Sequence, residues 1–272
     1  MSTRIHPKTE NGVAKQASSI VDILDSKIRP KAKTRRYDYW FETHRPLACL
    51  TFLLPLLLCY EVSAILHPNA VRSGIDQLVQ FLLGPLGDVS FIVLPFATVG
   101  SLLYLHHRKG HAEPFRMRTI IWMACESLAL AFILFLACDA LMLYWDNQRP
   151  EPLAGLASTF SDPQQFGRVM TCIGAGIHEE FVFRLLFFAP LLVWLNTKTD
   201  LKLIPLLFAA AVVSLVFAVA HCDIVNPEGS PFQLSTFLFR FFASVFLCLL
   251  FRFRGIAIAI GVHAIFDILA IS

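Results

Sequence analysis

The sequence predicts an all-α membrane protein, a polytopic bundle of about seven transmembrane helices, with six or eight as alternatives. Of its 272 residues, 56% are hydrophobic and 16% are charged, whereas a soluble domain has about 25% charged residues. The mean hydropathy is +0.61. The apolar residues gather in runs of about 20 residues, the length that crosses a bilayer core. This composition excludes most nucleic-acid-binding proteins, secreted disulfide scaffolds and soluble cofactor-binding folds, so we expect membrane lipids and no nucleic acid as partners.

A polar segment, residues 1–46, precedes the first apolar run and holds ten of the 23 Lys and Arg residues. Tyr37, Tyr39 and Trp40 lie near its end, which is typical of an aromatic anchor at a membrane interface. We predict a basic cytoplasmic tail that contacts lipid headgroups, with a disordered solvated tail as the alternative. Because the tail is much longer than the n-region of a signal peptide, we expect no secretory signal.

Seven apolar stretches follow the tail and are the predicted spans. They run approximately over residues 47–66, 89–105, 120–145, 166–195, 201–220, 232–251 and 256–271. A further segment, 75–86, is either an interfacial or re-entrant helix or the first part of the second span. We therefore divide the chain into the tail 1–46, the first three helices 47–165 and a C-terminal group of helices 166–272.

The distribution of basic residues predicts the orientation of these helices. With seven spans, 18 Lys and Arg residues lie on one side and three on the other, and two more, Arg184 and Arg240, lie inside spans. Cytoplasmic loops carry the excess of basic residues. We expect a multi-pass protein of the plasma (inner) membrane with its N-terminus in the cytoplasm. Arg240 needs a carboxylate partner, for which we predict Asp139 or Glu126 of the third span.

The seven cysteines are scattered along the chain and form no CxxC pair. Six of them lie inside apolar runs, so we interpret them as small packing residues rather than as metal ligands or disulfide partners.

The densest group of charges inside a predicted span is His178-Glu179-Glu180, followed by Arg184. Each ionised side chain at the bilayer centre costs about 2.5–3.5 kcal/mol on insertion scales, so such residues are functional candidates. Glu180 and Arg184 are four residues apart, share a helical face and can form an ion pair. Glu179 is rotated by about 100° from Glu180, which leaves it to face a polar cavity.

Two further histidines accompany this group. His221 ends the fifth span, and His263 lies four residues before Asp267 in the seventh, so that His263 and Asp267 share one face. Polar groups on three separate helices are what a site in a bundle core requires.

These residues form three motifs in order: Glu179-Glu180-x-x-x-Arg184, then Phe217-x-x-x-His221, then His263-x-x-x-Asp267. In this respect the chain resembles the CAAX protease and bacteriocin-processing (CPBP) family of intramembrane proteases, which includes the CAAX prenyl protease 2 type. The resemblance covers about residues 167–272, the last four predicted spans.

The resemblance implies an intramembrane endopeptidase that cuts a membrane-associated or lipidated protein or peptide. It implies that Glu179 and His221 activate a water molecule, with Glu179 as general base, and that Glu180 and Arg184 are supporting residues. His263 and Asp267 would stabilise the oxyanion. The family more often has Asn at the position of Asp267, so either Asp267 is protonated, as buried carboxylic acids can be, or it accepts a hydrogen bond from His263.

Three alternatives accompany this prediction. Bound zinc is one, because His178-Glu179 begins like the HExxH motif, but Val182 occupies the position of the second His; we therefore expect no cofactor. A non-catalytic immunity or scaffold protein is another, and a small-solute transporter a third, although the hydropathy pattern shows no inverted repeat.

The predicted topology raises one difficulty. His221 lies near the outer boundary, whereas Glu179 lies roughly 13 residues, or about 20 Å, further into its helix. The motifs meet only if the fifth span is tilted or its His-bearing end is carried inward. The side to which the site opens is left open.

Overall fold

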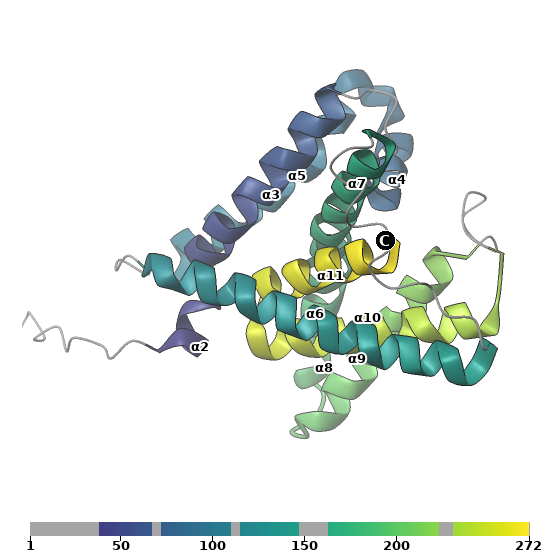
Figure 1. Cartoon of the computed structure of the whole chain (residues 1–272). Helices are drawn as coiled ribbons and strands as arrows, with labels where there is room; N and C mark the ends of the chain where they lie inside the picture. Colours follow the sequence, from purple (N-terminus) through teal and green to yellow (C-terminus); the bar gives the residue numbers. More distant parts are fainter. Residues whose placement is uncertain (1–37, 67–71, 110–114, 147–162, 223–230, 272) are drawn as a thin grey trace, which may run out of the picture. The chain divides into compact units, whose positions relative to one another are not determined.

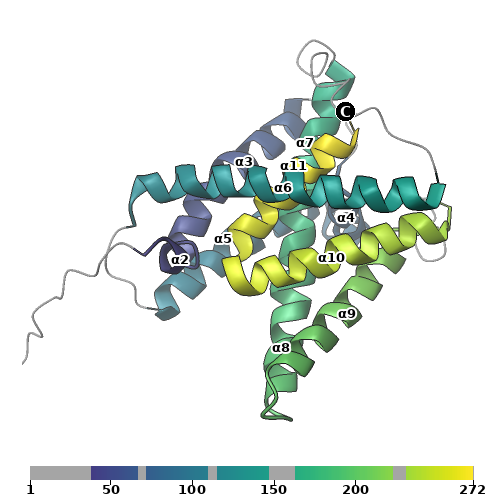
Figure 2. The same ribbon diagram turned by 60° about the horizontal axis from the view of Figure 1, so that its bottom comes forward.

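The computed structural model describes residues 38–66, 72–109, 115–146, 163–222 and 231–271, and these residues form helices without a β-strand (Figures 1 and 2). The helices are α2 (Tyr39–Glu42), α3 (Pro46–Leu66), α4 (Gly74–Leu82), the 3-10 helix η1 (Gly84–Val89), α5 (Ser90–Lys109), α6 (Met117–Asp146), α7 (Pro163–Glu180), the π-helix η2 (Phe181–Phe188), α8 (Ala189–Asn196), α9 (Leu203–Ala220), α10 (Leu234–Arg254) and α11 (Ile256–Ile271). The predicted all-α class is confirmed. Most of the predicted tail, residues 1–37, lies outside the described residues.

Helices occupy all seven ranges that the sequence predicts as spans. Four of the described helices are long and apolar enough to cross a membrane, namely α3, most of α6, α9 and α10. The apolar helix α11 is shorter. Segment 75–86 forms the separate nine-residue helix α4, which is followed by η1 with a break at Gly87 (φ 60°). The chain is a polytopic helical membrane protein, as predicted.

Helix α11 is enclosed by α3, α6, α7 and α10 (Figure 2). Ile258, Ile260 and Val262 are fully buried, whereas large apolar side chains of α6 such as Ile121 and Trp122 are exposed. A helix that is apolar on all sides is stable where protein surrounds it, and an exposed apolar face suits contact with lipid. The helix that carries His263 and Asp267 is therefore the core of the bundle.

Two glycines allow the neighbouring helices α10 and α7 to meet α11 closely. Gly255, at φ 90°, ends α10 and lets α11 begin at once, with its N–H bonded to the carbonyls of Leu250 and Phe251. Gly176 of α7 faces α11 so closely that a Cβ atom there would lie 2.8 Å from the backbone nitrogen of Ala264. This close approach sets the Glu179-Glu180 end of α7 directly against the segment of α11 that holds His263.

The arrangement of α7 and α9 explains how His221 comes close to Glu179, although the predicted spans place the two residues at different depths. α7, η2 and α8 follow one another without a gap, and α9 runs back alongside α8 and η2 (Figure 2). η2 and α8 have eight residues each and Glu179 lies just before them, while α9 has 18 residues and His221 follows it. Both residues are thus about equally far from the turn that joins α8 to α9. The expected separation of about 20 Å was wrong because α7 extends beyond the end of α9.

The beginning of the described chain is attached to the bundle by a polar cluster. Arg254, at the end of α10, is paired with Glu126 of α6 at 2.5 and 2.6 Å, and its guanidinium group lies over the rings of Tyr39 and Trp40. Tyr39 donates a hydrogen bond to Glu126, and burial together with Glu126 raises the pKa of the Tyr39 phenol. Glu126 is therefore the partner of Arg254, and its predicted pairing with Arg240 is wrong.

The cysteines are free thiols, and five of the seven are buried, which agrees with their predicted role in packing.

Candidate functional site

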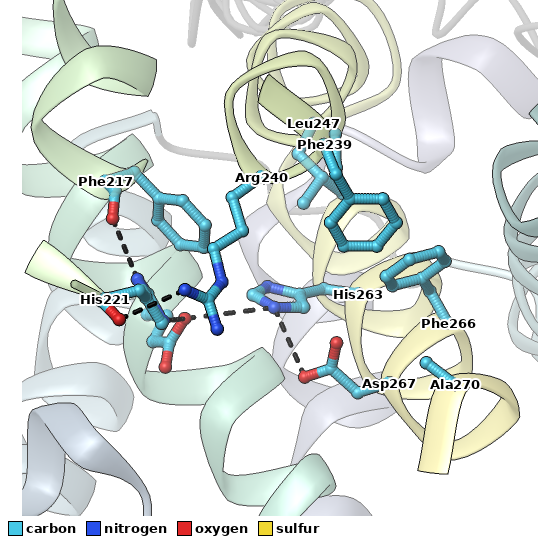
Figure 3. Close-up of a pocket in the computed structure, with 11 residues that line it drawn as sticks. Phe217, His221, Phe239, Arg240, Leu247, His263, Phe266, Asp267 and Ala270 are labelled. Carbon is cyan, nitrogen blue, oxygen red and sulfur yellow. Dashed lines mark hydrogen bonds and ion pairs between the residues drawn. The ribbon is translucent and has the colours of Figure 1, made fainter. Parts of the chain in front are cut away.

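The three predicted motifs meet at one pocket of about 250 Å³. Glu179 comes from the end of α7, His221 from the residue after α9, and His263 and Asp267 from α11. The pocket is lined by Glu179, Phe217, His221, Phe239, Arg240, Ala243, Leu247, His263, Phe266, Asp267 and Ala270 (Figure 3). The structure thus brings together all four predicted catalytic residues, and it surrounds them with a largely apolar wall.

Glu179 and His221 form the first pair in the pocket. The Oε2 atom of Glu179 lies 3.5 Å from Nε2 of His221. His221 donates from Nδ1 to the carbonyl oxygen of Phe217, one helical turn earlier, at 2.8 Å. This hydrogen bond holds the ring so that Nε2 faces the carboxylate. The backbone carbonyl four residues earlier thus orients the imidazole ring of His221.

Glu180 and Arg184 lie behind the pocket and are fully buried. Arg184 Nη1 lies 3.0 Å from Glu180 Oε1, so the predicted ion pair is confirmed. Arg184 also donates to the hydroxyl oxygen of Ser244 on α10 at 3.1 Å, and its guanidinium group lies 4.9 Å from the centre of the Phe217 ring. Arg184 therefore connects the motif of α7 with α9 and α10, because it lies in the π-helical segment η2 that these helices surround.

His263 contacts three carboxylates. Its Nδ1 lies 2.8 Å from Glu180 Oε1, and its Nε2 lies 3.5 Å from Asp267 Oδ2 and 3.9 Å from Glu179 Oε2. His263 and Asp267 share one face of α11, as their spacing predicts. The ring has a carboxylate oxygen beside each nitrogen. The 3.5 Å separation fits both alternatives for Asp267, since an ionised carboxylate would accept from Nε2 and a protonated one would donate to it.

Arg240 is a residue of the site that the sequence prediction did not include. It lies on α10, lines the pocket, and donates from Nη1 to the backbone carbonyl of His221 at 3.1 Å. Arg240 lines the same pocket as Glu179 and Asp267. Of its two predicted partners, Glu126 pairs with Arg254 instead, and the pairing with Asp139 stays a prediction. The signal for a site residue was its charge inside an apolar span.

His178 lies outside the pocket although it precedes Glu179 in the chain. Its ring is fully buried and packs edge to face on Tyr60 of α3, with 5.4 Å between the ring centres. Neither ring nitrogen has a hydrogen-bond partner among the described residues. His178 and Glu179 therefore face different neighbours. Within the described parts of the chain, no three His, Cys, Asp or Glu side chains are arranged to hold one metal ion.

The family model described as "Type II CAAX prenyl endopeptidase Rce1-like" matches residues 164–269. The match runs from the first turn of α7 nearly to the end of α11 and includes all six predicted site residues. No curated protein and no solved structure matches the chain.

Proposed function

We propose that this chain, a member of the Rce1-like family of type II CAAX prenyl endopeptidases, is an intramembrane endopeptidase whose water-activating pair is Glu179 and His221. The observation that carries the proposal is the 3.5 Å contact between these two side chains on the wall of a pocket that also holds His263 and Asp267. A carboxylate beside an imidazole ring, both facing a cavity, is an arrangement that can hold a water molecule and take its proton.

In the proposed reaction, a water molecule between Glu179 and His221 attacks the scissile carbonyl carbon. Its proton passes to the Glu179 carboxylate as the new C–O bond forms, and the electron pair of the C=O bond moves onto the carbonyl oxygen. The resulting oxyanion forms on the side of the pocket where His263 and Asp267 lie, and hydrogen-bond donors there stabilise it. When the intermediate collapses, the C–N bond breaks, the amide nitrogen takes the proton from Glu179, and the carboxylate is restored.

The lining of the pocket supports an apolar substrate. Besides the polar residues it consists of Phe217, Phe239, Phe266, Leu247 and two alanines. A pocket inside a helical membrane protein with such a wall suits a membrane-associated or lipidated protein or peptide. The name of the matching family makes a peptide with a prenylated CAAX cysteine the first substrate to test.

The test compares the membrane proteins and released peptides of cells that express wild type, Glu179→Gln or no protein. We expect a cleavage product that is present with wild type and absent with Glu179→Gln, at equal amounts of folded protein. In parallel, an internally quenched peptide with a farnesylated CAAX cysteine is presented to the purified protein in phosphatidylcholine vesicles. Identical peptide profiles together with a changed set of bound proteins would support a non-catalytic scaffold instead.

We also propose that the N-terminus lies in the cytoplasm, because 18 of the 23 basic residues fall on the side of the N-terminus when seven spans are assumed. Reporter domains fused to the N-terminus and inserted within residues 147–162 should report opposite sides of the membrane. The same side for both would contradict this topology.

A further inference from the structure

Arg240 lies at the centre of the pocket. Figure 3 shows its side chain reaching from α10 into the space between His221 and His263. Nη1 donates to the carbonyl oxygen of His221 at 3.1 Å, and the side chain lines the same pocket as Glu179 and Asp267. A guanidinium group has five N–H donors in a rigid plane, and the bond to His221 holds that plane in place. The cation therefore lies in the pocket that holds the proposed catalytic residues.

The proposed reaction requires hydrogen-bond donors where the oxyanion forms. An ionised Asp267 only accepts, and its Oδ2 lies 3.5 Å from His263 Nε2. The other ring nitrogen of His263 is occupied by Glu180, at 2.8 Å. His263 thus faces carboxylates with both nitrogens. Glu179 is neutralised by the proton of the attacking water as the oxyanion forms, but an ionised Asp267 would still repel the developing negative charge unless a cation lies close to it.

We propose that Arg240 is a further catalytic residue, which donates N–H hydrogen bonds to the oxyanion that forms when water attacks the scissile carbonyl. This inference rests on the proposed endopeptidase function and assigns to Arg240 the donor role that an ionised Asp267 cannot perform. No bond to Arg240 is made or broken. The proton of the attacking water moves to Glu179 and then to the leaving nitrogen, while Arg240 stabilises the negative oxygen in between. A positioned donor of this kind, in a site shielded from water, changes kcat by about 10²–10³.

The experiment measures kcat and KM for wild type, Arg240→Gln and Arg240→Lys with the farnesylated quenched peptide in vesicles. We expect kcat to fall by about 10²–10³ for Arg240→Gln and by less for Arg240→Lys, which keeps a positive donor, with KM changed by only a few-fold. Arg252→Gln is the matched control, because Arg252 lies on the same helix and is exposed. A wild-type kcat in folded Arg240→Gln would overturn the inference.

A second measurement distinguishes a catalytic role from a structural one. A phosphinate analogue of the same peptide places a negatively charged tetrahedral group at the scissile position. If Arg240 stabilises the oxyanion, the Ki of this analogue should rise from wild type to Arg240→Lys in proportion to the fall in kcat/KM. An unchanged Ki beside a reduced kcat/KM would mean that Arg240 only holds His221 in place, and would overturn the inference. Arg240→Lys decides the question even if Arg240→Gln does not fold.

The variant Asp267→Asn adds a test of the relation between the two residues. Because an Asn amide donates hydrogen bonds, the double variant Arg240→Gln/Asp267→Asn should be more active than the product of the two single effects predicts. Purely multiplicative effects would count against the exchange of donors.

If wild type and Glu179→Gln cleave the probe equally, or neither cleaves it, the proposed function itself fails. If Glu179→Gln is inactive while Arg240→Gln and Arg240→Lys keep the wild-type kcat, only the role of Arg240 is wrong.

Discussion

One carboxylate oxygen of Glu180 contacts the imidazole ring of His263. The Nδ1 atom of His263 on α11 lies 2.8 Å from Oε1 of Glu180 on α7, and the same oxygen lies 3.0 Å from Nη1 of Arg184 on η2. Glu180 and Arg184 are fully buried, and the side chain of His263 is 6% exposed. Neighbouring glutamates in the motif thus have different surroundings. Glu179 faces the pocket, while Glu180 connects the helices behind it.

We therefore predict that Glu180→Gln destabilises the protein. The substitution leaves the Arg184 guanidinium group as a buried charge without its carboxylate, which costs about 3–5 kcal/mol. Thermal unfolding in detergent measures the effect. The control is Glu179→Gln, the same substitution one residue earlier, whose nearest imidazole nitrogens lie at 3.5 and 3.9 Å. It should lower the melting temperature much less and abolish cleavage. Equal melting temperatures for the two variants would contradict the separation of roles.

The close approach of α7 and α11 predicts a strong effect of a single methyl group. In Gly176→Ala the new Cβ would lie 2.8 Å from the backbone nitrogen of Ala264, so the two helices must move apart, at a cost of about 1–3 kcal/mol. Because the Glu180–His263 contact spans these helices, kcat should fall as well. Gly100→Ala on α5 is the matched control, since a Cβ there meets no atom within 4 Å. If Gly176→Ala and Gly100→Ala both change stability and kcat only slightly, the close approach of α7 and α11 does not hold the site in place.

His221 should be required for catalysis but not for folding. Its side chain is 29% exposed, and its contacts include Glu179 and the Phe217 carbonyl. His221→Gln removes the imidazole ring that faces the water position, so we expect kcat to fall by about 10²–10⁴ with little change in melting temperature. The measurement is cleavage of the quenched peptide together with thermal unfolding. Wild-type kcat in this variant would rule out its proposed part in activating water.

His178 provides a test of the zinc alternative. We predict that activity persists in the presence of a zinc chelator and that His178→Phe changes kcat by no more than a few-fold, since the ring packs on Tyr60 rather than in the pocket. Phe has a similar shape and removes two buried ring nitrogens that lack partners among the described residues, so the variant should be as stable as wild type or more so. Loss of activity on chelation, restored by added zinc, would favour a metal site.

The features that depend on local geometry could be predicted from the sequence. Runs of apolar residues identified every long helix, and a spacing of four residues identified the Glu180–Arg184 pair and the shared face of His263 and Asp267, because residues four apart always meet on a helix. The three motifs, through their resemblance to a known family, also identified four of the residues that line the pocket, namely Glu179, His221, His263 and Asp267.

Which helices these residues face across the bundle depends on the tertiary structure. Glu126 and Arg254 are 128 positions apart, and Arg240 meets the end of α9. The different neighbours of His178 and Glu179, and the meeting of His221 with Glu179, depend likewise on where each helix begins and how it is rotated. Hydropathy shows that a helix is apolar but says little about its rotation where lipid and protein are equally apolar neighbours. Close packing at small residues such as Gly176 sets that rotation, and with it the site.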